Sequence, residues 1–191
     1  MDMDNDRRHQ NEEEKKESSS QNRESNYIER SKKVGRIGPA VTKLDAKTGY
    51  GTVHFHDKKD QLDVEATSGF ASIRANTGVF NGRYYYEVTL RTSGLMQIGW
   101  CTLQTTFNSQ RGVGDDQTSY SFDGYRVKKW NKDSLAFGEA WSVGDIIGTL
   151  IDFDRRTITF WRNYKSLGKA FTDFKIGPNM VYFPAISFQR G

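Results

Sequence analysis

The residues that could carry out nucleophilic or metal-dependent chemistry are few in this chain of 191 residues. Cys101 is the single cysteine, and the three histidines are His9, His54 and His56. Cys101 lies in the apolar string Ile-Gly-Trp-Cys, and no histidine accompanies it as a base, so we expect a buried thiol that packs as a small hydrophobe. A lone cysteine forms no intrachain disulfide, which is typical of a protein of the cytosol or the nucleus.

His54 and His56 are the one histidine pair with a spacing that suggests a metal site. Residues two apart point to the same face of a strand, so this pair would supply half of a zinc site. Carboxylates such as Asp57, Asp60 or Asp63 would have to complete it. We expect instead two exposed histidines on an edge strand, with no bound metal and no cofactor.

Two pairs of carboxylates could serve a calcium-dependent, lectin-like sugar site. Asp152 and Asp154 flank a predicted turn, where an aspartate more often orders a hairpin by accepting backbone hydrogen bonds. Asp115 and Asp116 lie in a longer loop and are the better functional candidates of the two pairs. The sequence contains no Gly-x-Ser-x-Gly elbow, phosphate-binding loop, HExxH helix or CxxC pair, so we expect a protein that is not an enzyme.

The elements that would position these residues are short strands that recur at close spacing, without a long helical periodicity between them. We predict strands over 50–56, 70–75, 84–91, 96–103, 119–122, 146–153, 157–162 and 181–188. Many short strands bounded by Gly, Asn and Asp turns predict two packed antiparallel sheets, because an isolated sheet would leave one apolar face in water. The chain has 12 Phe, 9 Tyr and 4 Trp, enough to fill a thick core between them.

The clearest hairpin lies within residues 144–171. Alternate residues from Ile147 to Phe153 share one strand face, and turns are predicted at Asp154-Arg155 and at Asn163-Tyr164. This segment, GDIIGTLIDFDRRTITFWRNYKSLGKAF, resembles the core of a SPRY domain, which has a Gly-Asp-hydrophobic strand, an Asp-x-Asp turn and a Leu-Gly-x-Ala-Phe closure. Further matches follow in the family order: GFASIRA, FNGRYYYEV, LMQIGWCT, GVGDDQTSYSFDG and YFPAIS.

The chain is most similar to the SPRY domain of large RING-type E3 ubiquitin ligases, through GLMQIGWCT, RVKKWN and RIGPA. The resemblance implies an all-β fold, a two-sheet antiparallel β-sandwich of the concanavalin-like jelly-roll type. It also implies a non-enzymatic protein-protein interaction module, a substrate-recruiting or scaffold domain of a ubiquitin-ligase system. The implied partner is a protein or a short peptide motif, and the chain would be part of a larger protein or complex.

In SPRY domains that grip short peptides, three segments make the contacts, and here they correspond to residues 63–68, 107–116 and 189–191. The aromatic and Trp-Gly residues of peptide-binding members are replaced here, so the resemblance carries over the location and not the ligand. The candidate partner-binding residues are Glu65, Thr67, Ser68, Asn108, Ser109, Arg111, Asp115, Asp116, Gln189 and Arg190.

The chain departs from the SPRY pattern at two places. Tyr164 stands where a Gly commonly follows the Asn of the second turn, and a bulky residue makes a type I′ turn costly, so we expect a longer or differently twisted loop. The family's final strand continues past Phe-Pro-Ala-Ile-Ser, whereas this chain stops at Gly191. Either the chain is a fragment of a longer protein, which we favour, or the last strand is truncated and leaves an open sheet edge.

The domain organisation follows from composition. Residues 1–36 contain one aromatic residue, Tyr27, and nine acidic and nine basic residues, so we expect a disordered charged leader there and a SPRY domain over 37–191. No run of about 18 apolar residues and no apolar signal region is present, so neither membrane insertion nor export is expected.

Basic residues gather around Trp130 and suggest a third kind of partner. Arg126, Lys128, Lys129 and Lys132 would give an RNA-associated SPRY module a phosphate-binding surface. A solvated strand edge that discourages aggregation is the better interpretation, so nucleic acid is not the expected partner. Protein binding is therefore the leading hypothesis, with a carbohydrate-binding sandwich and an RNA-associated module as alternatives.

Overall fold

A computed structural model of the chain describes residues 35–67 and 69–189, and the regular elements of these residues are all β-strands. The predicted leader therefore lies outside the described residues except for Gly35 and Arg36, and its boundary stays a prediction. The strands are β1 (Arg36–Ile37), β2 (Leu44–Tyr50), β3 (Val53–Phe55), β4 (Val64–Ala66), β5 (Phe70–Ala75), β6 (Gly78–Val79), β7 (Arg83–Thr89), β8 (Met96–Cys101), β9 (Ser119–Asp123), β10 (Lys128–Asn131), β11 (Asp133–Ala136), β12 (Ile146–Asp152), β13 (Thr157–Arg162), β14 (Lys165–Thr172) and β15 (Phe183–Gln189).

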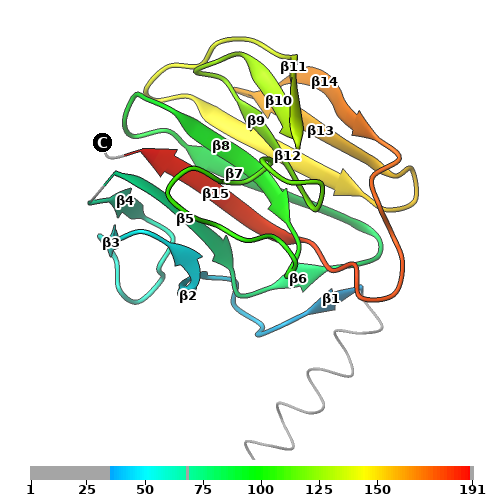
Figure 1. Ribbon diagram of the computed structural model, residues 1–191, viewed down its shortest axis with the longest axis horizontal. Helices are drawn as coiled ribbons and strands as arrows, with labels where there is room; N and C mark the ends of the chain where they lie inside the picture. Colours follow the sequence, from blue (N-terminus) through cyan, green and yellow to red (C-terminus); the bar gives the residue numbers. More distant parts are fainter. Residues whose placement is uncertain (1–34, 68, 190–191) are drawn as a thin grey trace, which may run out of the picture.

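Two large antiparallel sheets pack face to face, as the sequence predicted (Figure 1). The seven-stranded sheet has the order β11-β10-β9-β8-β15-β5-β2, and the four-stranded sheet has the order β14-β13-β12-β7. Two small pairings, β1 with β6 and β3 with β4, flank them. The all-β sandwich is thus confirmed.

The apolar alternation of the strands fills the space between the sheets. Ile147 and Ile151 of β12 and Ile158 and Phe160 of β13 are fully buried on the inner face of the four-stranded sheet. Trp100 reaches across from the seven-stranded sheet, and its indole N–H donates to the Thr149 hydroxyl at 3.0 Å. A buried indole N–H is costly without an acceptor, so this bond fixes how the two sheets face each other.

The tyrosine run of β7 alternates as the sequence predicted. Tyr84 and Tyr86 pack against the core, whereas Tyr85 is 45% exposed on the outer face, where its hydroxyl donates to Glu87 at 2.8 Å. The hydroxyl of Tyr86 donates to the Gly99 carbonyl of the opposite sheet. These tyrosines are therefore packing and bridging groups and not a platform for stacked bases.

The last described strand lies in the middle of the larger sheet. β15 pairs with β5 on one side and with β8 on the other, so it is not an open sheet edge (Figure 1). The possibility that the sandwich is left open at its final strand is therefore not borne out in the described residues. The predicted strand over 181–188 is displaced, because β15 begins only at Phe183 and continues to Gln189.

One predicted strand is divided in two. Residues 50–56 do not form a single strand, because Gly51, with φ +79°, bends the chain between β2 and β3. A side chain at this position would also clash with the carbonyl oxygen of Phe70, 2.8 Å from the place of a Cβ atom. The bend turns the β3–β4 hairpin toward the inner face of β5, where Val53 and Phe55 pack against Ala71 and Ile73.

The turn between β13 and β14 corrects another prediction. Asn163 and Tyr164 form a tight two-residue turn in which both φ angles are positive, 48° and 66°, as in a type I′ turn, and Arg162 pairs directly with Lys165. The expected longer or differently twisted loop was wrong. The Tyr164 side chain is 71% exposed and so meets little crowding, and the Asn163 amide is held on both sides by hydrogen bonds to Ile146 and Asp145.

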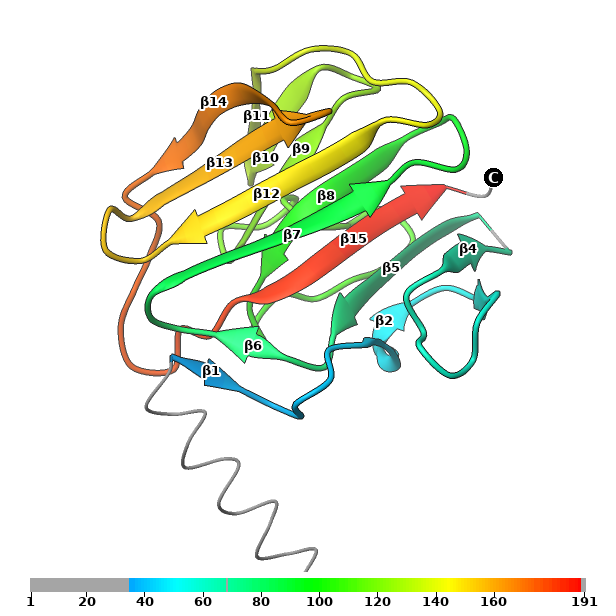
Figure 2. The same cartoon turned by 180° about the vertical axis from the view of Figure 1, so that it is seen from behind.

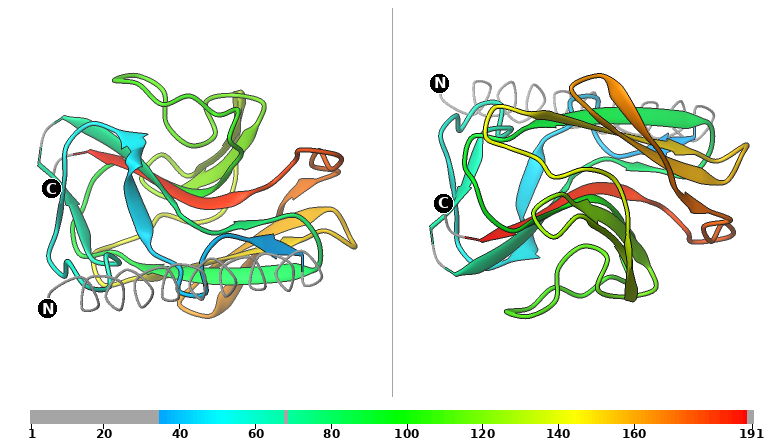
Figure 3. Two further views of the ribbon diagram at one scale, coloured as in Figure 1. Left: turned by 90° about the horizontal axis from the view of Figure 1, so that it is seen from below. Right: turned by 90° about the horizontal axis from the view of Figure 1, so that it is seen from above.

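The long β8–β9 connection covers the outer face of the seven-stranded sheet, which is the face directed away from the four-stranded sheet (Figure 3). Phe107 and Val113 of this connection pack on Cys101, Phe183 and Ala185. The thiol of Cys101 is therefore fully buried, as predicted, and burial raises its pKa to about 12 against the opposing effect of the nearby Arg74 guanidinium. Such a thiol is protonated at neutral pH and is not a nucleophile.

Candidate interaction site

The first candidate segment, residues 63–68, is largely a strand and not a loop. Glu65 lies in β4, and its carboxylate is 3.3 Å from the Nε2 of His56, which directly follows β3. The backbone N–H and the hydroxyl of Thr67 both donate to the carbonyl of Thr52, at 3.0 and 3.2 Å. Ser68 lies outside the described residues. Hairpin pairing therefore restrains the Glu65 and Thr67 backbone.

The second candidate segment contains an exposed, ordered tip. The side-chain oxygen of Asn108 accepts from the backbone N–H groups of Gln110 and Arg111, at 2.8 and 2.9 Å. The backbone N–H of Asn108 donates to the Arg111 carbonyl at 3.1 Å. This turn leaves Ser109 and Arg111 exposed. A tip held by its own hydrogen bonds loses little conformational entropy when a partner docks.

Asp115 and Asp116 hold the base of the same loop. Asp115 accepts from the Gln97 amide at 3.0 Å and from the Gly112 N–H at 2.8 Å. Asp116 accepts from the backbone and hydroxyl of Thr118, at 2.7 and 2.8 Å, and from the Ser119 hydroxyl at 3.0 Å. The two carboxylates therefore serve different parts of the loop and do not converge on one point.

Beneath this loop lies a buried polar patch that sequence reasoning missed. Ser72 and Ser187 share a hydrogen bond of 2.8 Å, and Ser187 also accepts from the Val113 N–H at 2.9 Å. Gln97 is buried, and its side-chain oxygen has no partner among the described residues. The signal in the sequence was one polar residue within each of three apolar strands, Ser72 in β5, Gln97 in β8 and Ser187 in β15. These three residues lie on the sheet face that the loop covers.

Phe70 is the point where two of the three candidate segments meet. A Cβ atom on Gly112 would lie 2.7 Å from the Phe70 ring, and Phe70 is the strand partner of Gln189. The Gln189 N–H also donates to the Leu95 carbonyl at 3.1 Å. Arg190 lies outside the described residues. The β8–β9 loop and the end of β15 are thus neighbours, whereas Glu65 belongs to a different place.

That place is a groove of about 910 Å³ between β7 and the β3–β4 hairpin. Its apolar lining comes from the inner face of the larger sheet and includes Met96, Ile186 and Phe188. Figure 2 shows β7 as the outer strand of the four-stranded sheet, with β15, β5 and β4 beyond it. Of the candidate residues that the structure describes, Glu65 alone lines this groove.

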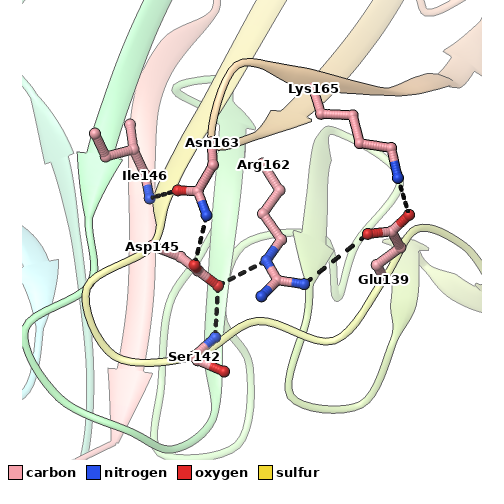
Figure 4. Close-up of polar contacts among 7 residues, drawn as sticks. All are labelled: Glu139, Ser142, Asp145, Ile146, Arg162, Asn163 and Lys165. Atoms are coloured by element: carbon pink, nitrogen blue, oxygen red, sulfur yellow. Dashed lines mark hydrogen bonds and ion pairs between the residues drawn. The ribbon is translucent and has the colours of Figure 1, made fainter.

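A further polar cluster ties the β11–β12 loop to the β13–β14 turn (Figure 4). Asp145 accepts from the Ser142 N–H, the Arg162 Nε and the Asn163 amide, each at 2.7 Å. Burial opposes ionisation of this carboxyl, but these three hydrogen bonds and the charge of Arg162 hold its pKa below the ordinary value. Every donor belongs to the fold itself, so the cluster is a structural latch.

The turn between β12 and β13 behaves as predicted for one of its two carboxylates. Asp152 is buried and accepts from the Arg155 N–H at 2.9 Å, which orders the turn. Asp154 is exposed.

The basic residues around Trp130 do not share one surface. The Arg126 guanidinium lies 4.0 Å from the centre of the Trp130 ring, with Lys128 at 5.9 Å on the same ring. Lys129 points the other way, where its ammonium group donates to the Ala170 carbonyl and lies 5.4 Å from the Phe171 ring. A phosphate-binding surface needs convergent cations, and this arrangement divides them.

Neither a metal cluster nor a membrane-spanning helix is seen in the described part of the chain. Within residues 35–67 and 69–189, no three His, Cys, Asp or Glu side chains gather in a way that could hold a metal ion. The same residues form no helix with the length and apolar character that crossing a bilayer requires. His54 and His56 do share a face, with ring centres 5.1 Å apart, and His56 is turned to Glu65.

The fold and the surface together define a two-sheet β-sandwich with an ordered outer loop and an inter-sheet groove. The SPRY domain family model matches residues 83–191, more than half of the chain, so this chain belongs to the SPRY family, whose domains are protein-interaction modules. Over 156 residues, 81% of its length, the chain is 44% identical to the E3 ubiquitin-protein ligase RKP of Arabidopsis thaliana. It spans 12% of the length of that relative.

Proposed function

We propose that this chain is a non-enzymatic recruitment or scaffold domain of a ubiquitin-ligase system, which binds a protein partner and presents it to the ligase. The observation that carries the proposal is the 44% identity to the E3 ubiquitin-protein ligase RKP. The fold suits the task, because a rigid sandwich that displays ordered loops loses little order on binding. The buried, protonated Cys101 is compatible with the reducing cytosol or nucleus that we propose as its location.

The partner contacts are proposed at the tip of the β8–β9 loop and at the neighbouring end of β15. Asn108, Ser109 and Arg111 form the exposed tip, and Gln189 extends the same surface across Phe70. Arg190 lies outside the described residues and is proposed as a contact because it follows Gln189 in the sequence. Asp115 and Asp116 would act indirectly, by holding the base of the loop through the hydrogen bonds described above. The partner motif would be polar or charged, because the tip carries no exposed aromatic side chain.

The proposal is tested by using the full chain as bait in cells and comparing it with two single variants. Arg111→Glu reverses the charge at the loop tip, whereas Asp154→Lys changes an equally exposed charge in the β12–β13 turn. We expect captured proteins to include ubiquitin-ligase components or their substrates, and the Arg111→Glu variant to lose them while the Asp154→Lys variant retains them. Equal capture by both variants would remove the loop tip from the proposal.

Glycan and RNA binding provide the contrary outcomes. A chain that captures no protein but binds a glycan array only with calcium present would be a lectin. RNA binding that weakens steeply with added salt, and that is lost when Arg126, Lys128, Lys129 and Lys132 are neutralised, would assign it to RNA instead.

A further inference from the structure

One edge of β7 is free of strand partners among the described residues. Within residues 35–67 and 69–189, β7 pairs with β12 alone, and it is the terminal strand of its sheet. Leu90 bonds to the β12 side through both its N–H and its C=O, and Gly82 does so through its C=O. Backbone direction alternates along a strand, so the N–H and C=O groups of Tyr84, Tyr86 and Val88 also face β12, while those of residues 85, 87 and 89 point away from it. Glu87 and Thr89 line the groove.

The floor of the groove is apolar, and its place beside β7 suits an added strand. Strands in a sheet lie about 4.8 Å apart, so a strand beside β7 would lie over the inner face of β15 and β5. Met96, Ile186 and Phe188 line that part of the groove. Alternate side chains of an added strand would therefore contact this floor, and those between them would point outward beside Glu87.

The rim of the groove is acidic. The ionisable lining residues are Asp57, Asp60, Asp63, Glu65, Glu87, Lys43, Arg91 and His56. Arg91 is paired with Asp63 at 3.2 Å, and His56 with Glu65 at 3.3 Å. Among the described residues no cation is paired with Asp57, Asp60 or Glu87, and the Lys43 ammonium group is taken up by the Lys59 carbonyl. The rim thus has uncompensated negative charge, which complements a basic ligand.

We infer that this groove binds an extended segment of a partner protein in which basic and apolar residues alternate, and that the segment adds to β7 as an antiparallel strand. The inference rests on the proposed function as a protein-binding module and names a second surface for it, separate from the β8–β9 loop tip. The apolar residues of the segment cover the floor, and its basic residues face Glu87 and Asp60. Its backbone forms hydrogen bonds with the N–H and C=O groups of Tyr85, Glu87 and Thr89.

The probe is a fluorescein-labelled peptide of seven residues that alternates lysine and valine, and its binding to the full chain is followed by fluorescence anisotropy. In an antiparallel pair, two residues that exchange backbone hydrogen bonds have side chains on the same side of the sheet. The peptide residues that bond to the free edge of β7 therefore point outward, as Glu87 does, and in this peptide those residues are the lysines. N-methylation of the lysine amides should weaken binding at least about tenfold, whereas N-methylation of the valine amides should have little effect. Equal binding of both peptides would overturn strand addition.

Amide hydrogen exchange, measured residue by residue by NMR, provides the most specific readout. In the free protein, the amides of residues 85, 87 and 89 should exchange quickly, and those of residues 84, 86 and 88 slowly. The peptide should slow the first set at least about tenfold and leave the second unchanged. Protection of neither set by a peptide that binds would place the binding elsewhere and contradict the inference.

Charge variants test the chemistry of the partner. Asp60→Lys should weaken the lysine–valine peptide about fivefold at low ionic strength, and the matched surface change Asp154→Lys, outside the groove, should not. A glutamate–valine peptide should not bind. Binding of the acidic peptide as tight as that of the basic one would refute the charge argument.

The remaining outcomes separate this inference from the proposed function. A chain that forms dimers in sedimentation, and loses them in the Asp60→Lys variant, would show that a second copy occupies the groove and would overturn the peptide partner. If the peptide does not bind but the chain still captures ligase proteins, the inference about the groove is wrong and the proposed function stands. Peptide binding and β7 protection without any captured ligase protein would support the groove and remove the ubiquitin-ligase assignment.

Discussion

The carboxylate of Asp145 and the guanidinium of Arg162 lie 2.7 Å apart, and this contact joins a loop to a strand end 17 residues further along the chain (Figure 4). Asn163 extends it, because its amide donates to Asp145 while its oxygen accepts from the Ile146 N–H at 2.8 Å. At the outer side, Arg162 and Lys165 both approach Glu139, at 3.9 and 2.9 Å. The latch therefore fixes where β12 begins relative to the β13–β14 turn.

Removal of the Asp145 charge should destabilise the fold. Asp145→Ala leaves three donors without their acceptor, which should lower the free energy of unfolding by about 2–3 kcal/mol. Urea denaturation followed by tryptophan fluorescence measures it. Asp154→Ala, in an exposed position, should change the same quantity by less than about 0.5 kcal/mol. An equal loss in both variants would show that the latch contributes nothing of its own.

The same carboxyl predicts a pH dependence. The pKa of Asp145 is lower in the folded protein than its ordinary value of about 3.9, so its contribution to stability is complete above that value and is lost as the pH falls through the folded pKa. The difference in unfolding free energy between the natural chain and Asp145→Asn should therefore shrink below about pH 4. A difference that stays constant down to pH 2 would contradict the assigned pKa direction.

Cys101 should be inert in the folded protein. Its thiol is buried and has a pKa of about 12, so Ellman's reagent should react at least about a hundredfold more slowly with the native chain than with the chain in urea. The chain has one cysteine, so the assay reports on this site alone. Rapid labelling under native conditions would mean that the β8–β9 connection opens from the sheet.

Two strand glycines should respond differently to alanine. A Cβ on Gly99 would lie 1.9 Å from the carbonyl oxygen of Tyr120, a backbone atom that cannot move away, so Gly99→Ala should cost about 3 kcal/mol or prevent folding. A Cβ on Gly148 would meet the ring end of Tyr85, which is partly exposed and can turn aside. Gly148→Ala should therefore cost about 1 kcal/mol or less in thermal unfolding. The reverse order would be inconsistent with the β8–β9 pairing.

The β13–β14 turn should be stabilised by glycine. Tyr164 holds a φ of 66° that costs an L-residue free energy, and its side chain is mostly exposed, so Tyr164→Gly should raise the unfolding free energy by about 0.5–1 kcal/mol. Tyr164→Ala removes the ring but keeps the strain and should be nearly neutral. A destabilised glycine variant would mean that the tyrosine ring makes contacts worth more than the strain.

The sheet-forming strands could be predicted because burial imposes a period of two on them. Residues 70–75 and 157–162 became strands over the predicted ranges, and the buried thiol at Cys101 followed from its apolar neighbours. β14 was missed because its alternation is broken, with register shifts against β13 and a positive φ at Gly168. A pattern that is interrupted in this way has no constant period to detect.

The candidate site was predictable only in part, because its geometry depends on pairing between distant segments. The loop tip at Ser109 and Arg111 is exposed as its sequence suggests, but nothing local shows that Phe70 and Gln189 lie beside it. The groove arises because β7 is a sheet edge and because Gly51 turns the β3–β4 hairpin toward β5. Neither the position of a strand in its sheet nor the direction of a hairpin has a sequence period.

The central place of β15 in the larger sheet also has a consequence for biosynthesis. Its two neighbours, β5 and β8, lie about 100 residues earlier in the chain and have no described strand between them until β15 arrives. The two parts of the sheet therefore cannot join while Phe183–Gln189 are still inside the ribosome exit tunnel. Contacts of such long sequence separation form slowly, so the nascent chain would display two unpaired strand edges, a period in which chaperone binding would guard against aggregation.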